Sequence, residues 1–239
     1  MKTYTPRIVA FLSCFLLSSS ILYSQETDTN DFELWSSVGV SYAVNDKIKV
    51  GLKEQLRLKE NATTTDTYFT DLVLEYELFK DFEIGLGFRY ITKNDNKGKK
   101  QGFENHFRYN IDLSYKYDFN RINASHRIRY QNKNQLGVNE QDGDLVPQGV
   151  RIKSGLKYDF ENSPLEPSFS LEIFNKFTKN DRFRIQNYKT SKYRLTYGLS
   201  YKWDQIGKFK VFYRRENIVL EVLPKNIDIV GLNYVYSIH

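Results

Sequence analysis

Apolar and polar residues alternate with a period of two along most of this chain, which is the pattern of a β-strand with one apolar and one polar face. The clearest run extends from Phe103 to Phe119, where mostly aromatic and aliphatic odd positions alternate with charged or polar even positions. The same alternation runs from Leu74 to Tyr90 on both sides of the turn residues Lys80 and Asp81. We therefore predict a strand–turn–strand unit at Leu74–Tyr90.

The alternation predicts eleven strands, at residues 32–44, 48–59, 66–79, 82–93, 103–119, 121–132, 148–160, 167–178, 189–203, 208–217 and 226–238. A short motif, exemplified by LEYEL from Leu74 and LSYKY from Leu113, closes every second strand. It recurs at intervals of roughly 33 to 43 residues, the length of one hairpin with its loop. The chain therefore has the character of an all-β, antiparallel, up-and-down protein.

The connections between the strands are short at one end and longer at the other. Short turns such as KD and NR follow the recurring motif, whereas ENATTTD, NDNKGKKQG and the stretches 133–147 and 179–188 join the other ends. Aromatic residues gather beside the short turns, for example Phe79, Phe82, Tyr201 and Trp203. This asymmetry, together with a rim of aromatic rings, is typical of a transmembrane barrel of the bacterial outer membrane.

Such barrels normally have an even number of strands. We therefore expect about twelve strands, within a range of 10–12. Either a further strand is hidden near Asp28 to Leu34, or one of the eleven runs is not part of the wall. A lipocalin-like soluble barrel is an alternative, but an apolar interior enclosed by eleven strands would leave a large void. A soluble β-sandwich is the other alternative, and it favours Greek-key spacing over regular hairpins.

The first 24 residues read as a cleaved secretory signal, and residues 25–239 as a single outer-membrane barrel domain. Lys2 and Arg7 precede an apolar stretch from Ile8 to Tyr23 that contains the single cysteine, Cys14. A membrane anchor and a lipoprotein signal are the competing interpretations of this stretch. With two of the 35 basic residues in the signal, the mature chain has 33 basic and 29 acidic residues, a net charge of +4. This surplus is too small to indicate a nucleic-acid-binding protein.

The charged residues of the strands fall on the polar face, which points inward in a membrane barrel. We expect a basic lumen and a narrow, porin-like passive channel for small anionic or neutral solutes. The alternative is a closed barrel whose charges pair across strands, and which acts through its extracellular loops. The candidate pore-lining residues are Lys49, Lys53, Arg57, Arg89, Arg108, Arg127, Arg129, Arg151, Lys153, Lys157, Arg194 and Arg214.

No constellation of residues indicates an enzyme. A lipid-modifying enzyme of the outer membrane would need a nucleophile, a base and an orienting group together near the rim. His106 is predicted to face inward, while His126 faces lipid beside Ser125, which points the other way. Ser237 and His239 share a face but lie at the end of the chain. We therefore predict no catalytic residue, no cofactor and no metal site, and keep a lipid hydrolase as the weakest alternative.

The expected surroundings are outer-membrane lipid and lipopolysaccharide, with a small solute in the lumen and no nucleic-acid partner. The basic loop Lys97-Gly98-Lys99-Lys100 has the charge to meet lipopolysaccharide phosphates outside the cell, although such a run is commonly only a solvated loop.

Several segments together resemble a known family. They are FELWSSVGVSYAVNDKIKVGLKEQLRL, TDLVLEYELFKDFEIGLGFRY, ENHFRYNIDLSYKYDF and YRLTYGLSYKW. The chain resembles domain-of-unknown-function family 2490, a group of bacterial outer-membrane-barrel-like proteins, over essentially the whole mature sequence. The resemblance implies a barrel fold in the outer membrane of a Gram-negative bacterium. It implies no activity and no catalytic residue.

Overall fold

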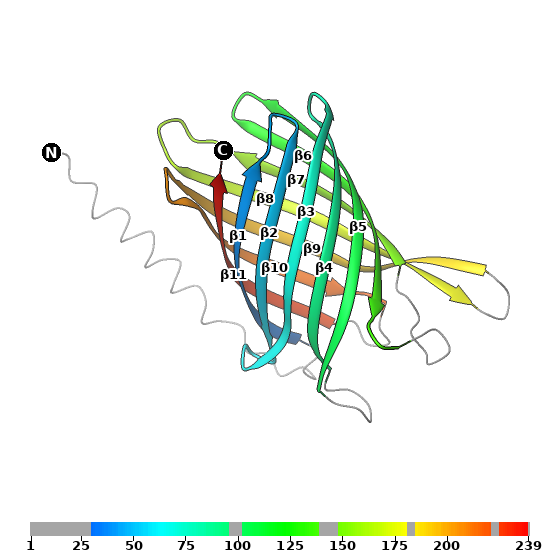
Figure 1. Cartoon of the computed structure of the whole chain (residues 1–239). Coiled ribbons are helices and arrows are strands. Elements are labelled where there is room, and N and C mark those ends of the chain that lie inside the picture. The colour runs from blue at the N-terminus through cyan, green and yellow to red at the C-terminus, as the bar shows by residue number, and fades with distance from the viewer. Residues whose placement is uncertain (1–29, 96–101, 139–147, 181–184, 221–224, 239) are drawn as a thin grey trace.

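The alternating segments form one closed β-barrel in the computed structural model (Figure 1). The structure describes residues 30–95, 102–138, 148–180, 185–220 and 225–238, and side chains within these ranges except at 178–188. The predicted signal at 1–24, the loop Lys97–Lys100 and His239 lie outside the described residues. The described part contains eleven strands: β1 Asn30–Ala43, β2 Ile48–Lys59, β3 Thr64–Phe79, β4 Phe82–Asp95, β5 Gly102–Phe119, β6 Ile122–Gln135, β7 Gln148–Tyr158, β8 Leu165–Asn180, β9 Ile185–Trp203, β10 Gly207–Ile218 and β11 Lys225–Ile238.

Each strand pairs antiparallel with the next along the chain, so the predicted up-and-down order is confirmed. The barrel closes between β1 and β11, which run parallel, with Leu34 opposite Val230 and Val38 opposite Tyr234. A parallel seam lets an odd number of strands close, because the first and last strands then point the same way. Eleven strands lie within the predicted range and one below the expected twelve. The segment near Asp28 to Leu34 contributes residues 30–34 to β1 and forms no separate described strand.

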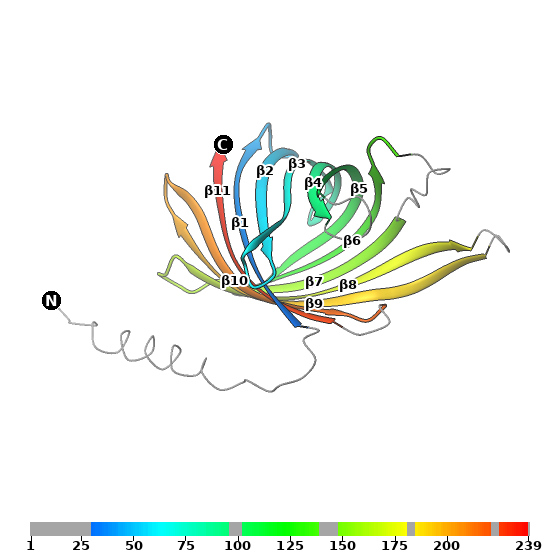
Figure 2. The same cartoon turned by 90° about the horizontal axis from the view of Figure 1, so that it is seen from below.

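The two ends of the barrel differ, as the sequence indicates (Figure 2). One end, called the short-turn end here, has connections at 44–47, 80–81, 120–121, 159–164 and 204–206. Asp81 and Asn120 adopt positive φ angles of 68° and 53°, which two-residue hairpins require and which Asp and Asn tolerate. Connections at the opposite end span 60–63, 96–101, 136–147, 181–184 and 219–224. The predicted loop 179–188 was too long, because β8 and β9 continue to Asn180 and from Ile185.

Aromatic rings meet at the short-turn end. Phe79 and Phe82 stack across the β3–β4 turn with their centroids 4.9 Å apart. Tyr158 packs edge-on against Phe160, and Tyr201 against Trp203. The predicted rim of rings is therefore present as contacts between neighbouring side chains, an arrangement that suits amphipathic rings at a boundary between water and an apolar phase.

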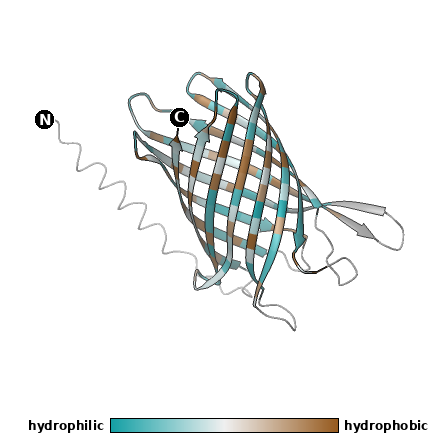
Figure 3. Cartoon of the chain, viewed as in Figure 1, coloured by the Kyte–Doolittle hydropathy of each residue, from teal (hydrophilic) through white to brown (hydrophobic). Residues whose placement is uncertain are grey.

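The wall of the barrel has an apolar outside and a polar inside. Leu72, Leu86 and Ile128 are each 40% exposed or more on the outer surface. Charged side chains such as Asp71 and Arg129 are buried on the inner face, and hydrophobic and hydrophilic positions alternate along the strands (Figure 3). This orientation excludes the lipocalin-like alternative, whose apolar face would point inward. The closed order of the strands likewise excludes the β-sandwich. Within the described ranges, the structure has no helix that is long and apolar enough to span a membrane.

Candidate functional site: the charged interior of the barrel

The structure places the predicted lumen residues on the interior face. Arg108 is only 5% exposed and lies 3.9 Å from a carboxylate oxygen of Asp71. Lys49 pairs in register with inward Glu75, and Lys157 lines a space near the short-turn end. The role of the predicted lumen residues in a pore stays a prediction. The other nine line one cavity, namely Lys53, Arg57, Arg89, Arg127, Arg129, Arg151, Lys153, Arg194 and Arg214.

Two interior arginines are neutralised by carboxylates on the adjacent strand. Arg89 on β4 donates from Nε and Nη2 to the two oxygens of Asp71 on β3, at 3.0 and 2.5 Å. Arg129 on β6 makes the same two-pronged contact with Asp112 on β5, at 2.7 and 2.5 Å. Such paired contacts satisfy the charge and fix the plane of the guanidinium group.

A third arginine joins three strands. Arg194 on β9 donates from Nη1 to Glu172 on β8 at 3.0 Å, and from Nε to Glu216 on β10 at 2.6 Å. Lys192 donates a further hydrogen bond to Glu216 at 2.5 Å. Glu172 and Glu216 are 5% and 3% exposed. Because these charges are buried, each depends on its partners for its stability.

Aromatic rings lie among these cations, and together they form a packed layer. The guanidinium of Arg57 lies 3.6 Å from the centroid of the Trp35 ring, and that of Arg194 lies 5.6 Å from the same ring. Since β1 and β9 are not neighbours in the wall, side chains from separated strands meet inside the barrel. We call this set the arginine–aromatic layer: Trp35, Phe69, Phe174 and Phe212 with Arg57, Arg89, Arg151, Arg194 and Arg214.

A glycine makes room for two rings of this layer. Gly231 on β11 pairs in register with Trp35 on one side and with Phe212 on the other. A Cβ atom at Gly231 would collide with the Phe212 ring, so only glycine permits this approach. Trp35 and Phe212 then pack with Ile227 and Ile229. None of the four rings is more than 5% exposed, so the layer strongly narrows the lumen.

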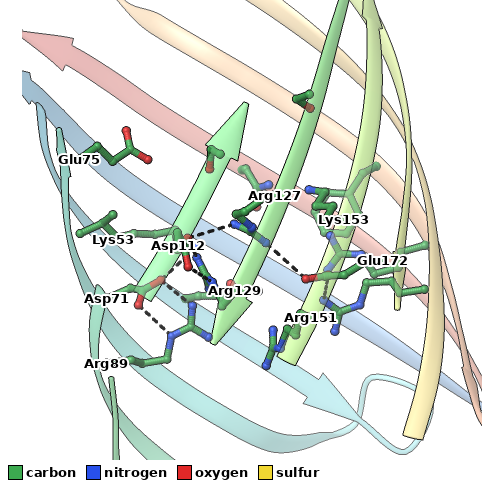
Figure 4. Close-up of a pocket in the computed structure, with 18 of the residues that line it drawn as sticks. Lys53, Asp71, Glu75, Arg89, Asp112, Arg127, Arg129, Arg151, Lys153 and Glu172 are labelled. Carbon is green, nitrogen blue, oxygen red and sulfur yellow. Dashed lines mark hydrogen bonds and ion pairs between the residues drawn. The ribbon is translucent and has the colours of Figure 1, made fainter. Parts of the chain in front are cut away.

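An open space that we call the basic chamber lies on the side of the layer that faces the short-turn end. Figure 4 shows the charged side chains that line it. Its volume is about 430 Å³, and Trp35 and Phe212 form part of its lining. A second space of about 710 Å³ shares Lys116 and Lys153 with it and reaches Asp81 in the β3–β4 turn. The two spaces are therefore neighbours, and the second extends from the chamber side toward the short-turn end of the barrel.

The inward rings were not anticipated from the sequence. Each ring occupies an inward position of its strand, where the alternation predicts a polar residue. Phe69 lies three residues before outward Leu72, and Phe212 directly follows outward Val211. The available signal was this phase break, in which an aromatic residue occupies a polar position next to an apolar one. A phase break alone does not show which side chains the ring contacts.

One polar contact lies on the outer face. His126 points outward as predicted, and its Nδ1 atom lies 3.0 Å from Oγ of Ser154 on the next strand. The Tyr117 ring stacks on the imidazole with a centroid separation of 6.1 Å. Ser154 is 28 residues from His126 in the sequence, so this partner could not be predicted from the neighbours of His126 and depends on the pairing of β6 with β7. In the described part of the chain, no carboxylate forms an ion pair with His126.

Most of the chain matches one protein family. The family described as "Protein of unknown function (DUF2490)" matches residues 32–220, from β1 to just beyond β10. The chain belongs to this family. The resemblance seen in the sequence is thereby confirmed. No curated protein matches the chain.

The DUF2490 match supplies no chemistry, so the interior of the barrel must be interpreted from its own residues. The described residues contain no group of three or more His, Cys, Asp or Glu side chains that could hold a metal ion. The layer and the chamber are instead built from cations, carboxylates and rings. This arrangement is suited to holding or passing small charged solutes.

Proposed function

We propose that this protein spans the outer membrane of a Gram-negative bacterium and provides a narrow passive path for small anions. The observation that carries the proposal is the polarity of the wall, which is apolar outside and charged inside. Soluble monomers rarely expose contiguous apolar patches beyond a few hundred square ångströms. An apolar band around a barrel is stable when lipid covers it.

The dimensions and the ends of the barrel support the same environment. Each strand has between 11 and 19 residues, as in β7 and β9, which is enough to cross the hydrocarbon core when tilted. The rings at the short-turn end suit a membrane interface. In this orientation, the short turns face the periplasm and the longer connections face lipopolysaccharide.

The lumen supports a preference for anions. Ten cationic and five acidic side chains line the basic chamber, and a surplus of one sign in a low-dielectric space concentrates ions of the opposite sign. Transport along this path has to pass the arginine–aromatic layer. We therefore expect a low conductance, set by how often the side chains of the layer move apart.

The test is single-channel recording of the refolded mature protein in a planar bilayer, with a salt gradient across it. Small, discrete openings with an anion-selective reversal potential are the expected result. An inserted, folded protein that stays silent would overturn the channel. The second candidate would then apply: a closed barrel that acts through its loops, which the burial of the four rings of the layer favours.

A lipid-modifying enzyme has one supporting contact, between His126 and Ser154. A histidine activates a serine best when a third group holds its ring. The described residues provide no such carboxylate near His126, and the pair also has a simple role, since each side chain satisfies the other in an apolar band. We therefore do not propose an enzyme.

A further inference from the structure

We infer that the basic chamber is a binding site for a small organic phosphate that enters from the short-turn end. This inference rests on the proposed orientation of the barrel in a membrane, and it deepens the proposed function by naming a ligand class. It does not require conduction, because the ligand can enter and leave on the same side.

Charge is the first support. The ten cations lining the chamber outnumber its five carboxylates by five. Burying like charges together is costly unless anions neutralise them. Four of the five carboxylates are already engaged. Asp71 accepts from Arg89, Asp112 from Arg129, and Glu172 from Arg194. Glu83 accepts from Lys116. The surplus therefore rests on cations that the protein itself does not neutralise.

Four cations that line the chamber lack an ion-pair partner among the described residues. In the described part of the chain, none of the ion pairs within 4.0 Å includes Arg57, Arg151, Lys153 or Arg214. The Nε atoms of Arg57 and Arg151 are buried and have no hydrogen-bond partner. Buried N–H groups are nearly always paired in proteins, so unpaired ones indicate a place for an acceptor.

The unpaired arginines are held in place by rings. Arg57 lies over Trp35, Arg151 lies 4.4 Å from the centroid of Phe174, and Arg214 lies 4.7 Å from that of Phe212. Stacking covers the flat face of a guanidinium and leaves the N–H groups at its edge for hydrogen bonds. In Arg214 one of these groups, at Nε, donates to Oγ1 of Thr196 at 2.9 Å. The guanidinium is the group that recognises phosphate oxygens through paired hydrogen bonds, and it needs little ordering when already held.

The placement of these cations favours phosphate over a carboxylate. Arg57, Arg151 and Arg214 come from β2, β7 and β10, which lie on different sides of the closed wall. A carboxylate has two oxygens and a single charge, whereas a phosphate ester presents three charged oxygens in different directions. Lining residues Ser114, Ser125 and Asn233 add neutral donors for the organic part.

Access from the short-turn end follows from the packing. The arginine–aromatic layer narrows the lumen on the other side of the chamber. The space that leads to the short turns is lined by five lysines and four carboxylates, so it has a surplus of one positive charge. Lys116, Lys157 and Lys208 already form ion pairs, which leaves Lys153 and Lys210 as the cations that would attract an anion there. A periplasmic phosphate ester would therefore reach the site without passing the layer.

The experiment is isothermal titration of the refolded mature protein in detergent at low ionic strength, with glucose 6-phosphate as the probe. Glucose, acetate and inorganic phosphate are the comparison ligands. We expect glucose 6-phosphate to bind in a salt-sensitive manner, inorganic phosphate to bind more weakly, and glucose and acetate to give no signal. Absence of glucose 6-phosphate binding, or equal binding of acetate, would overturn the inference.

The matched variants are Arg214→Gln and Arg215→Gln. Arg214 faces the chamber, whereas the next residue, Arg215, lies on the outer face near Asp228. We expect Arg214→Gln to weaken binding roughly tenfold or more, the effect of losing one charge-assisted hydrogen bond, and Arg215→Gln to leave it unchanged. Equal weakening by both variants would show a general charge effect and contradict a built site.

Arg151→Gln is a second chamber variant, which keeps the test valid if Arg214→Gln does not fold. Migration of unheated and heated samples on gels checks the folding of all variants. The site and the channel then fail in different ways. A barrel that stays silent in the bilayer yet binds glucose 6-phosphate would refute conduction alone. A barrel that conducts anions but does not bind the probe would refute the site alone.

Discussion

The paired and the unpaired cations inside the barrel are of the same residue types but differ in what they face. In the layer, Arg194 lies between two carboxylates, and rings cover the flat faces of the guanidinium groups. In the chamber, Arg214 and Lys153 form no ion pair within the described residues. Inward charge therefore does not by itself indicate an open pore. What matters is how many of the charges the protein neutralises.

This difference relates the two interpretations of the inward charges. Paired charges such as Arg194 and Glu216 hold the wall together, whereas unneutralised charges such as Arg214 and Lys153 are available to an anion. Both kinds occur in the same lumen. The layer then sets the stability and the conductance, and the chamber sets the selectivity.

The largest expected effect is on the paired charges of the layer. Glu216→Gln removes the carboxylate that holds both Arg194 and Lys192. Breaking a buried ion pair on one side should lower the free energy of unfolding by about 3–5 kcal/mol. Urea unfolding in lipid vesicles measures it. The control is Glu75→Gln in the chamber, because no ion pair is found for Glu75 in the described chain. An equally large loss of stability in this variant would contradict the distinction between paired and unpaired charges.

The next effect is on the rings. Trp35→Ala removes the ring on which Arg57 and Arg214 stack, so we expect a loss of about 3 kcal/mol in stability and a higher single-channel conductance. Trp203→Ala, at the exposed aromatic rim, is the matched control and should leave the conductance unchanged. If Trp35→Ala does not raise the conductance, the layer is not the constriction.

A smaller effect is expected in the chamber. Lys153→Gln removes one unneutralised charge, so it should shift the reversal potential in a salt gradient toward zero with little change in stability. Arg215→Gln removes a charge from the outer face and should leave the reversal potential unchanged. A shift in both variants, or in neither, would contradict selectivity by the chamber. Arg129 is unsuited to this test, because its substitution would remove the two hydrogen bonds that it donates to buried Asp112.

The smallest effect is expected outside both regions. Ser154→Ala removes the hydrogen bond to His126 on the outer face and should lower the stability by about 1 kcal/mol. Vesicle phospholipids incubated with the wild type and with this variant should stay equally intact by mass spectrometry. Release of lysolipid by the wild type that disappears in Ser154→Ala would instead establish an enzyme.

The sequence predicts the wall well because alternation is local. The strand Phe103–Phe119 agrees with β5 to within one residue, and inward Arg89 and Arg108 follow from the phase of their neighbours. The parallel seam between β1 and β11 could not be predicted, because pairing of the first and last strands leaves no local pattern. For the same reason, the contacts of Arg57 with Trp35 and of His126 with Ser154 require the register of separate strands.

The most direct test of the central claim compares two consecutive residues on opposite faces of β3. Leu72 is 43% exposed on the outer surface, and Val73 lines the basic chamber. The only native cysteine, Cys14, lies in the predicted signal, so Leu72→Cys and Val73→Cys can each carry a fluorophore in the mature protein. In vesicles, we expect acyl-chain nitroxide lipids to quench the label at position 72, and aqueous iodide to quench the label at 73. Quenching of position 72 by iodide and not by the lipids would show that the apolar face does not touch the membrane.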